Sequence, residues 1–126
     1  MAAKKILVAD DESHILHVVS LKLRNAGFEV LTASDGQEAL ELAQAQRPDL
    51  LITDYHMPQL SGLELCRKLK GDPATAAIPA IMLTARGYQL DPKDTKDSGI
   101  LRMLSKPFSP RHLLTTVNEV LLEAAA

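Results

Sequence analysis

The sequence predicts an α/β fold built around a parallel sheet of five strands. Five short apolar runs are nearly continuous instead of alternating between polar and apolar residues, which is typical of strands buried on both faces. Segments with apolar residues at three- and four-residue steps separate these runs. The two patterns alternate along the whole chain, with no linker and no internal repeat. We therefore expect right-handed crossovers and helices on both faces of the sheet.

The strands are expected where the apolar runs lie. The second run is the weakest, because Thr32 interrupts it. Aromatic residues make up only 3% of the chain, so the core around these strands must be aliphatic. The predicted strands are residues 6–9, 30–33, 50–53, 80–84 and 100–104.

Helices are expected between the strands. Gly27 and Gly71 follow the first and third apolar stripes, where glycine commonly ends a helix. Ser109 can cap the last helix and Pro110 fits its first turn. Cys66 lies in the third stripe, which predicts a packed or half-buried thiol. The stripes predict helices over residues 13–26, 36–46 and 61–70 and from residue 110 onward.

The segment before the fifth strand is a weaker helix prediction. Residues 87–98 read GYQLDPKDTKDS, with mixed charge and almost no apolar face. A late start at Asp91-Pro92 leaves about two turns before Gly99. We expect this helix to be short or mobile and a poor surface for hydrophobic dimerisation. The final Glu-Ala-Ala-Ala is expected to be a tail.

Composition excludes several classes of protein. A chain of 126 residues fits one domain and can bury a core without disulfides. The net charge of -2 gives no sign of the clustered Lys and Arg that direct nucleic-acid binding needs. The single cysteine excludes a disulfide framework and a multi-cysteine zinc site. Since no apolar run suits a signal peptide or approaches the ~18 residues of a membrane span, we expect a cytoplasmic protein without a membrane segment.

Polar residues follow the predicted strands at the sheet edge where function gathers in such folds. They are Asp10 and Asp11 after the first strand, Asp54 after the third, Thr84 at the end of the fourth and Lys106 after the fifth. If the first and third strands are neighbours, three carboxylates converge on one spot. Each feature alone fits a turn residue or a helix cap. The full set, at four strand ends, predicts a functional site.

The residue types at these strand ends suit phosphoryl transfer. Carboxylates at close quarters repel one another unless a cation neutralises them, and hard oxygen ligands suit Mg²⁺ or Mn²⁺. Lys106 adds a positive charge and Thr84 a hydroxyl donor. Phosphoryl transfer needs positioning and charge neutralisation more than other chemistry, and a carboxylate can itself be the nucleophile. The sequence therefore predicts an aspartyl phosphate at Asp54 in a magnesium-binding pocket.

Four motifs carry a family resemblance. They read ILVADDE at residues 6–12, LLITDYHMPQLSGLEL at 50–65, IMLTA at 81–85 and LSKPF at 104–108. Residues 4–122 thereby resemble one receiver domain of two-component response regulators, of the chemotaxis-regulator type, with no second domain. The resemblance implies a flavodoxin-like (βα)5 three-layer sandwich with strand order 2-1-3-4-5. It also implies a phosphoprotein that switches conformation to alter partner binding and that is not an enzyme.

The resemblance assigns the acidic residues. Asp54 is the phosphoacceptor, served by a histidine kinase or a histidine phosphotransfer protein. Asp11 binds the metal directly and Asp10 binds it through water. Asp54 and the backbone carbonyl of His56 complete the protein ligands. The kinase, the downstream effector and the oligomeric state do not follow from the resemblance.

The resemblance also assigns the phosphoryl-binding and switch residues. Lys106 pairs with the phosphoryl oxygens, and its bond to Pro107 is cis. Thr84 moves towards the phosphoryl group, and this movement is the switch. Met103 stands where receivers usually carry a tyrosine or phenylalanine. It can follow Thr84, because methionine is flexible, or it can simply fill the core.

The resemblance also implies that two further side chains face the mouth of the pocket. His56 lies two residues after Asp54, and Arg86 lies two residues after Thr84. Our hypothesis is that both set the lifetime of the phosphorylated state by admitting or blocking water. An ordinary solvent-exposed role for His56 is the alternative.

Other functions compete with the phosphoacceptor switch. A phosphohydrolase with an aspartate nucleophile often carries a second aspartate where this chain has His56, and the chain lacks an obvious cap domain. A flavin-binding flavodoxin lacks support, because the acidic first loop would repel a phosphate without a metal. A degenerate receiver acting as a binding scaffold is disfavoured by the complete set of Asp10, Asp11, Asp54, Thr84 and Lys106.

Overall fold

A computed structural model describes residues 3–85, 91–96 and 98–125. Its five strands form one parallel sheet in the order β2-β1-β3-β4-β5. This is the flavodoxin-like order that the resemblance implied. Every strand end lies within one residue of its predicted position. The strands are β1 (Lys5–Ala9), β2 (Glu29–Ala33), β3 (Leu50–Asp54), β4 (Ala80–Thr84) and β5 (Ile100–Ser105).

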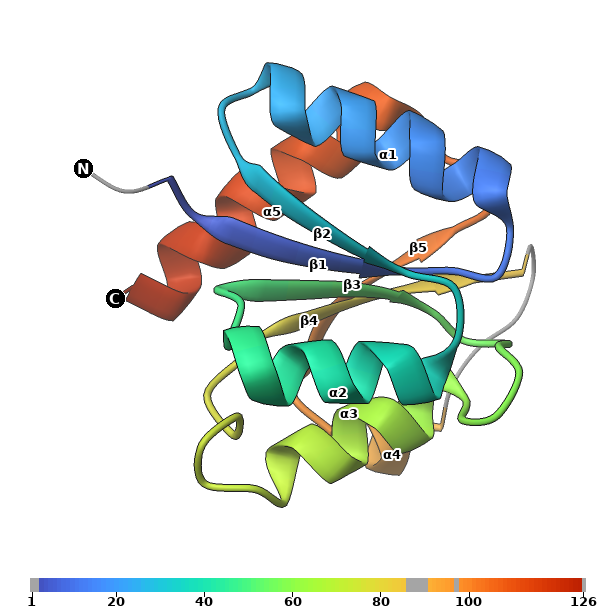
Figure 1. Ribbon diagram of the computed structural model, residues 1–126, viewed down its shortest axis with the longest axis vertical. Coiled ribbons are helices and arrows are strands. Elements are labelled where there is room, and N and C mark those ends of the chain that lie inside the picture. Colours follow the sequence, from blue (N-terminus) through green and yellow to red (C-terminus); the bar gives the residue numbers. More distant parts are fainter. Residues whose placement is uncertain (1–2, 86–90, 97, 126) are drawn as a thin grey trace.

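Helices cover both faces of the sheet and make the three-layer sandwich that was predicted (Figure 1). On one face lie α1 (Ser13–Asn25) and α5 (Pro110–Ala125). On the other lie α2 (Gly36–Gln46), α3 (Gly62–Lys70) and the short α4 (Pro92–Lys96). The chain leaves β1 towards one face and β3 towards the other. The carboxyl ends of these neighbouring strands therefore flank the crevice in which such sheets bind ligands.

The prediction for the fourth helix is confirmed, and that for the C-terminal segment is not. The fourth helix begins at Pro92 and is short, as predicted, although residues 87–90 lie outside the described residues. The predicted C-terminal tail is wrong, because α5 continues through Ala125. Alanine and glutamate favour a helix, and Glu123 forms an ion pair with Arg102 of β5. Within the described ranges, no helix combines the length and apolar character needed to cross a bilayer.

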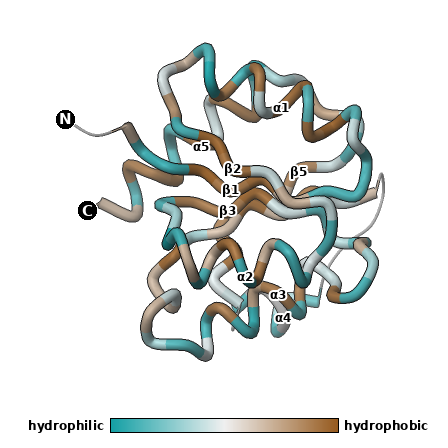
Figure 2. The backbone as a smooth tube through the Cα atoms, viewed as in Figure 1, coloured by the Kyte–Doolittle hydropathy of each residue, from teal (hydrophilic) through white to brown (hydrophobic). Residues whose placement is uncertain are grey.

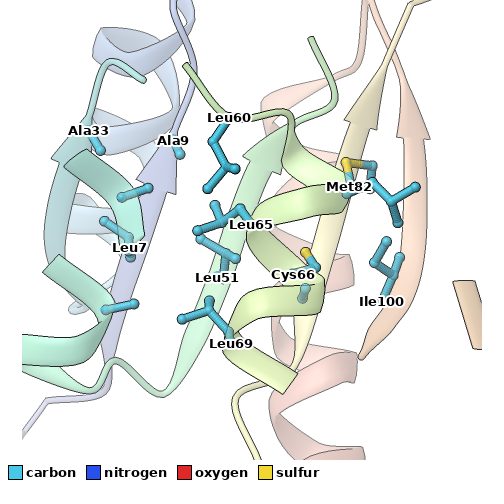
Figure 3. Close-up of a cluster of buried hydrophobic side chains, with 14 residues drawn as sticks. Leu7, Ala9, Ala33, Leu51, Leu60, Leu65, Cys66, Leu69, Met82 and Ile100 are labelled. Atoms are coloured by element: carbon cyan, nitrogen blue, oxygen red, sulfur yellow. The ribbon is translucent and has the colours of Figure 1, made fainter. Parts of the chain in front are cut away.

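Aliphatic side chains fill the spaces on both sides of the sheet. In Figure 2 the strands form a hydrophobic centre, and hydrophilic segments lie on the outer helices. One cluster packs under α2 and α3 and includes Leu51, Leu65 and Met82 (Figure 3). The other packs under α1 and α5 and includes Ile52. Cys66 belongs to the first cluster, and burial raises the pKa of its thiol to about 12, so it is a packed and unreactive thiol.

Helix caps fix the chain where three of the helices begin. Asp35 accepts a hydrogen bond from the Glu38 N–H at the start of α2. Ser61 forms a reciprocal capping box at the start of α3. Ser109 accepts from the backbone of α5, as predicted. Glu12 precedes α1 but makes no capping hydrogen bond with its side chain, so this side chain is left for another contact.

Candidate functional site

The register of the sheet brings two carboxylates together. Ala9 of β1 pairs with Thr53 of β3, so the residues that follow them, Asp10 and Asp54, lie side by side at the carboxyl edge. Asp10 is 0% exposed and Asp54 is 6% exposed. An ionised carboxylate in such a position costs free energy unless a cation or hydrogen-bond donors compensate it. A counter-charge is therefore required at this edge.

Lys106 supplies that charge from the other side of the site. Thr84 of β4 pairs with Ser105, the last residue of β5, so Lys106 follows at the same edge. The Lys106 backbone N–H donates to the Thr84 carbonyl at 2.8 Å, and Thr84 itself is 1% exposed. The peptide bond between Lys106 and Pro107 is cis, as the resemblance implied. Residues from four strands thus meet at one edge of the sheet.

The Lys106 ammonium faces three carboxylates. Its Nζ lies 2.9 Å from Asp10 Oδ2, 3.5 Å from Asp54 Oδ2 and 3.3 Å from Glu12 Oε1. The closest of these contacts is the ion pair with Asp10 Oδ2, which is buried. The other oxygen, Asp10 Oδ1, accepts from the Glu12 N–H at 2.9 Å. One cation does not neutralise three anions, so the site keeps a negative charge.

The pKa values reflect this imbalance. Burial, together with the charge of Asp10, raises the pKa of Asp54 from 3.8 to about 6, although Lys106 opposes the shift. Burial also raises the pKa of Asp10, against the Glu12 N–H and Lys106. For Lys106, burial alone lowers the pKa, but the paired carboxylates outweigh it and the net shift is upward. The lysine therefore stays charged, and the ionised forms of Asp10 and Asp54 are destabilised in the folded protein.

A solvent-open cavity of about 210 Å³ gives access to the site. Its lining consists of Asp11, Glu12, Asp54, His56, Ala85 and Lys106. Carboxylate oxygens of Asp10, Asp11 and Glu12 lie within 4.8 Å of one another. Several carboxylate oxygens gathered beside one pocket suit a hard divalent cation.

The other predicted site residues, His56, Met103 and Arg86, do not share one location. His56 is exposed at the cavity, and its ring meets that of Tyr55 edge to face with centroids 4.6 Å apart. The role of its backbone carbonyl stays a prediction. Met103 is half-buried, pairs with Met82 of β4 and packs against the cluster under α2 and α3, as a core side chain would. Arg86 lies outside the described residues.

Two contacts of the site were not predicted from the sequence. Glu12 entered only as the last residue of the first family motif, and its contact with Lys106 spans 94 positions. Gly62 entered only as one residue of the second family motif. A Cβ at Gly62 would lie 2.2 Å from the Asp54 carbonyl oxygen, so α3 begins pressed against the end of β3. The only signal in the sequence was a glycine directly after the helix cap Ser61.

The chain belongs to the response regulator receiver domain family, whose model matches residues 6–118. Over 118 residues it is 39% identical to the alkaline phosphatase synthesis transcriptional regulatory protein PhoP of Bacillus subtilis. That match covers 94% of this chain and 48% of PhoP. The chain spans about half the length of the curated relatives it matches, which include transcriptional regulators.

Solved structures agree with the family. The chemotaxis response regulator CheY4 of Vibrio cholerae matches with a TM-score of 0.87 and 37% identity, covering 94% of this chain and 99% of CheY4. The receiver domain of the sensor histidine kinase PA1611 from Pseudomonas aeruginosa matches with a TM-score of 0.84 and 28% identity. That match covers 95% of this chain and 98% of the PA1611 domain, which has a magnesium ion coordinated in its active-site cleft.

Proposed function

We propose that the protein is a switch in which Asp54 accepts a phosphoryl group from a histidine kinase or a histidine phosphotransfer protein. One observation carries the proposal: Asp54 opens onto a solvent-accessible cavity while Lys106 lies within 3.5 Å of its carboxylate. A nucleophilic oxygen and a fixed cation at one pocket are the parts that phosphoryl transfer needs. Membership of the receiver family supports the same assignment.

The transfer is a displacement at phosphorus. An Asp54 carboxylate oxygen forms a bond to phosphorus while the bond from phosphorus to the donor's leaving group breaks, and the leaving group keeps the electron pair. When the donor is a phosphohistidine, that group is an imidazole nitrogen. Lys106 is placed to neutralise charge on the phosphoryl oxygens. The raised pKa of Asp54, about 6, still leaves most of this carboxyl ionised at neutral pH.

A divalent cation belongs to this proposal. We expect Mg²⁺, or Mn²⁺, to be held by Asp54, by Asp11 directly, by Asp10 through water and by the His56 carbonyl. Such an ion would supply the positive charge that Lys106 alone does not provide. The excess of carboxylates over the single lysine and the raised pKa values of Asp10 and Asp54 support binding of such a cation. The magnesium ion in the PA1611 receiver supports it by similarity.

For the switch we look to Thr84, which is buried at the end of β4 and whose backbone carbonyl accepts from the Lys106 N–H. A phosphoryl group on Asp54 would attract the Thr84 hydroxyl, and this movement would be the switch. Met103 follows on β5 and would adjust to that movement, and His56 would tune access of water, as we expect also of Arg86. The protein would assist its own phosphorylation and dephosphorylation without turning over a substrate. A cytoplasmic location and the absence of direct nucleic-acid binding stay predictions.

One experiment tests the proposal. The protein is incubated with acetyl phosphate and Mg²⁺, and the modified residue is located by mass spectrometry, with Asp54→Ala as the control. We expect one phosphoryl group, on Asp54, that is absent from the variant. Multiple turnover of small phosphate esters would favour a phosphohydrolase instead. Absence of any label at Asp54 would leave the binding scaffold as the better description.

A further inference from the structure

We infer that Glu12 is a positioning residue that holds Lys106 in the unphosphorylated protein, and that a phosphoryl group on Asp54 has to take the lysine from it. The inference rests on the proposed function and adds a regulatory contact to the same site. Its basis is the contact between Glu12 Oε1 and Lys106 Nζ, 3.3 Å long, which joins the start of α1 to the loop before α5.

The backbone aims the Glu12 side chain at the pocket. Glu12 is the N-cap of α1, with φ −90° and ψ 109°, and its side chain makes no capping hydrogen bond. Its N–H donates to Asp10 Oδ1, which anchors the backbone beside the buried carboxylate. The helix does not use this side chain, although N-cap side chains commonly accept from the first turn. It reaches the cavity lining instead.

Glu12 differs from the other two carboxylates around the lysine in one respect. The side chains of Asp10 and Asp54 are 0% and 8% exposed, whereas that of Glu12 is 57% exposed. Glu12 can therefore leave the lysine for water at little cost, and the buried aspartates cannot. Added negative charge beside Lys106 should displace Glu12 first.

A phosphoryl group is such a charge. Its oxygens need Lys106, and they would sit near the Glu12 carboxylate at the same pocket. Glu12 thus opposes phosphorylation twice, by occupying the lysine and by repelling the phosphoryl oxygens. Removing the contact should raise the ratio of phosphorylated to unphosphorylated protein at a fixed donor concentration.

The test compares three variants with the wild type. Glu12→Gln removes the charge at nearly constant size. Glu12→Asp keeps the charge but shortens the side chain and favours capping of α1, which withdraws it from Lys106. Glu29→Gln is the matched control, because Glu29 also pairs with a lysine, is 56% exposed and lies at the amino end of β2, away from the site.

The measured quantity is the ratio of labelled to unlabelled protein at subsaturating acetyl phosphate with Mg²⁺, read by intact mass at low and high salt. We expect Glu12→Gln to raise the ratio by about two- to fivefold at low salt, as for one partly exposed ion pair, and Glu12→Asp, which keeps the repelling charge, to raise it by less. The increase should shrink at high salt. Glu29→Gln should match the wild type.

Several results would overturn the inference. One is a Glu12→Gln ratio equal to that of the wild type. Another is a Glu12→Asp ratio equal to that of the wild type, since charge at the pocket mouth, and not the contact, would then matter. An increase that salt leaves unchanged would point to a structural effect. The proposed function fails separately, if the wild type takes no label at Asp54.

Discussion

Without a divalent cation, the Asp54 charge should destabilise the fold, and Asp54→Asn should therefore stabilise it. Asparagine has nearly the shape of aspartate but carries no charge. Asp54 is 6% exposed, lies beside Asp10 and shares Lys106 with two other carboxylates. Its local environment thus favours a neutral side chain, and functional sites commonly carry such a cost in stability.

The pKa gives the size of the effect. The pKa of Asp54 rises from 3.8 to about 6 on folding. Because the folded protein holds this proton more tightly, the free energy of unfolding falls as pH rises through that window and stays low above it. A shift of about two units corresponds to roughly 3 kcal/mol. The gain from Asp54→Asn should therefore reach about 2–3 kcal/mol at pH 8 and largely vanish near pH 4.

Urea unfolding followed by circular dichroism, in buffer with EDTA, measures this difference. Asp49→Asn is the matched control, because Asp49 directly precedes the same strand, is exposed, and its Oδ2 accepts a hydrogen bond from the Lys5 N–H at 2.8 Å. That control should be neutral or slightly destabilising. The electrostatic reasoning would be refuted by an Asp54→Asn protein that is no more stable than the wild type at pH 8. A gain of equal size at pH 4 and pH 8 would refute it too, since packing would then be the cause.

Three further outcomes are expected. Millimolar Mg²⁺ should raise the melting temperature of the wild type by several degrees and that of Asp54→Asn much less, because a ligand stabilises only a fold that binds it. Gly62→Ala should cost more than about 2 kcal/mol in urea unfolding, since its Cβ would lie 2.2 Å from the Asp54 carbonyl, whereas Gly71→Ala, with 3.5 Å to its nearest neighbour, should be tolerated. Ser20→Ala should stabilise by about 1 kcal/mol, because the Ser20 hydroxyl is buried and, within the described ranges, has no hydrogen-bond partner.

Three results would contradict these expectations. Equal Mg²⁺ effects on wild type and Asp54→Asn would place the cation elsewhere. A Gly62→Ala protein as stable as Gly71→Ala would mean that α3 can move away from β3 freely. A Ser20→Ala protein less stable than the wild type would mean that the hydroxyl has a partner, such as a buried water.

The sequence alone determined the order and type of the elements. Hydrophobic periodicity is a local property, and it placed every strand within one residue. The polar residues after the strands then predicted a site of aspartates, threonine and lysine, and the family motifs predicted the strand order and the role of each residue. The error at the C-terminus also had a local cause, because Glu123-Ala124-Ala125 was judged as a tail although its residues favour a helix.

Only the tertiary structure decided how the site is charged. Whether Lys106 lies among three carboxylates depends on the register of β1, β3 and β5 and on the angle of each side chain, and no local pattern encodes these. The contact with Glu12 joins residues 94 positions apart, and the raised pKa of Asp54 arises from burial that only packing creates. The sequence named the groups that can carry a phosphoryl transfer. The fold decided which carboxylates share the Lys106 ammonium, because electrostatic interactions depend on distance and burial and not on sequence order.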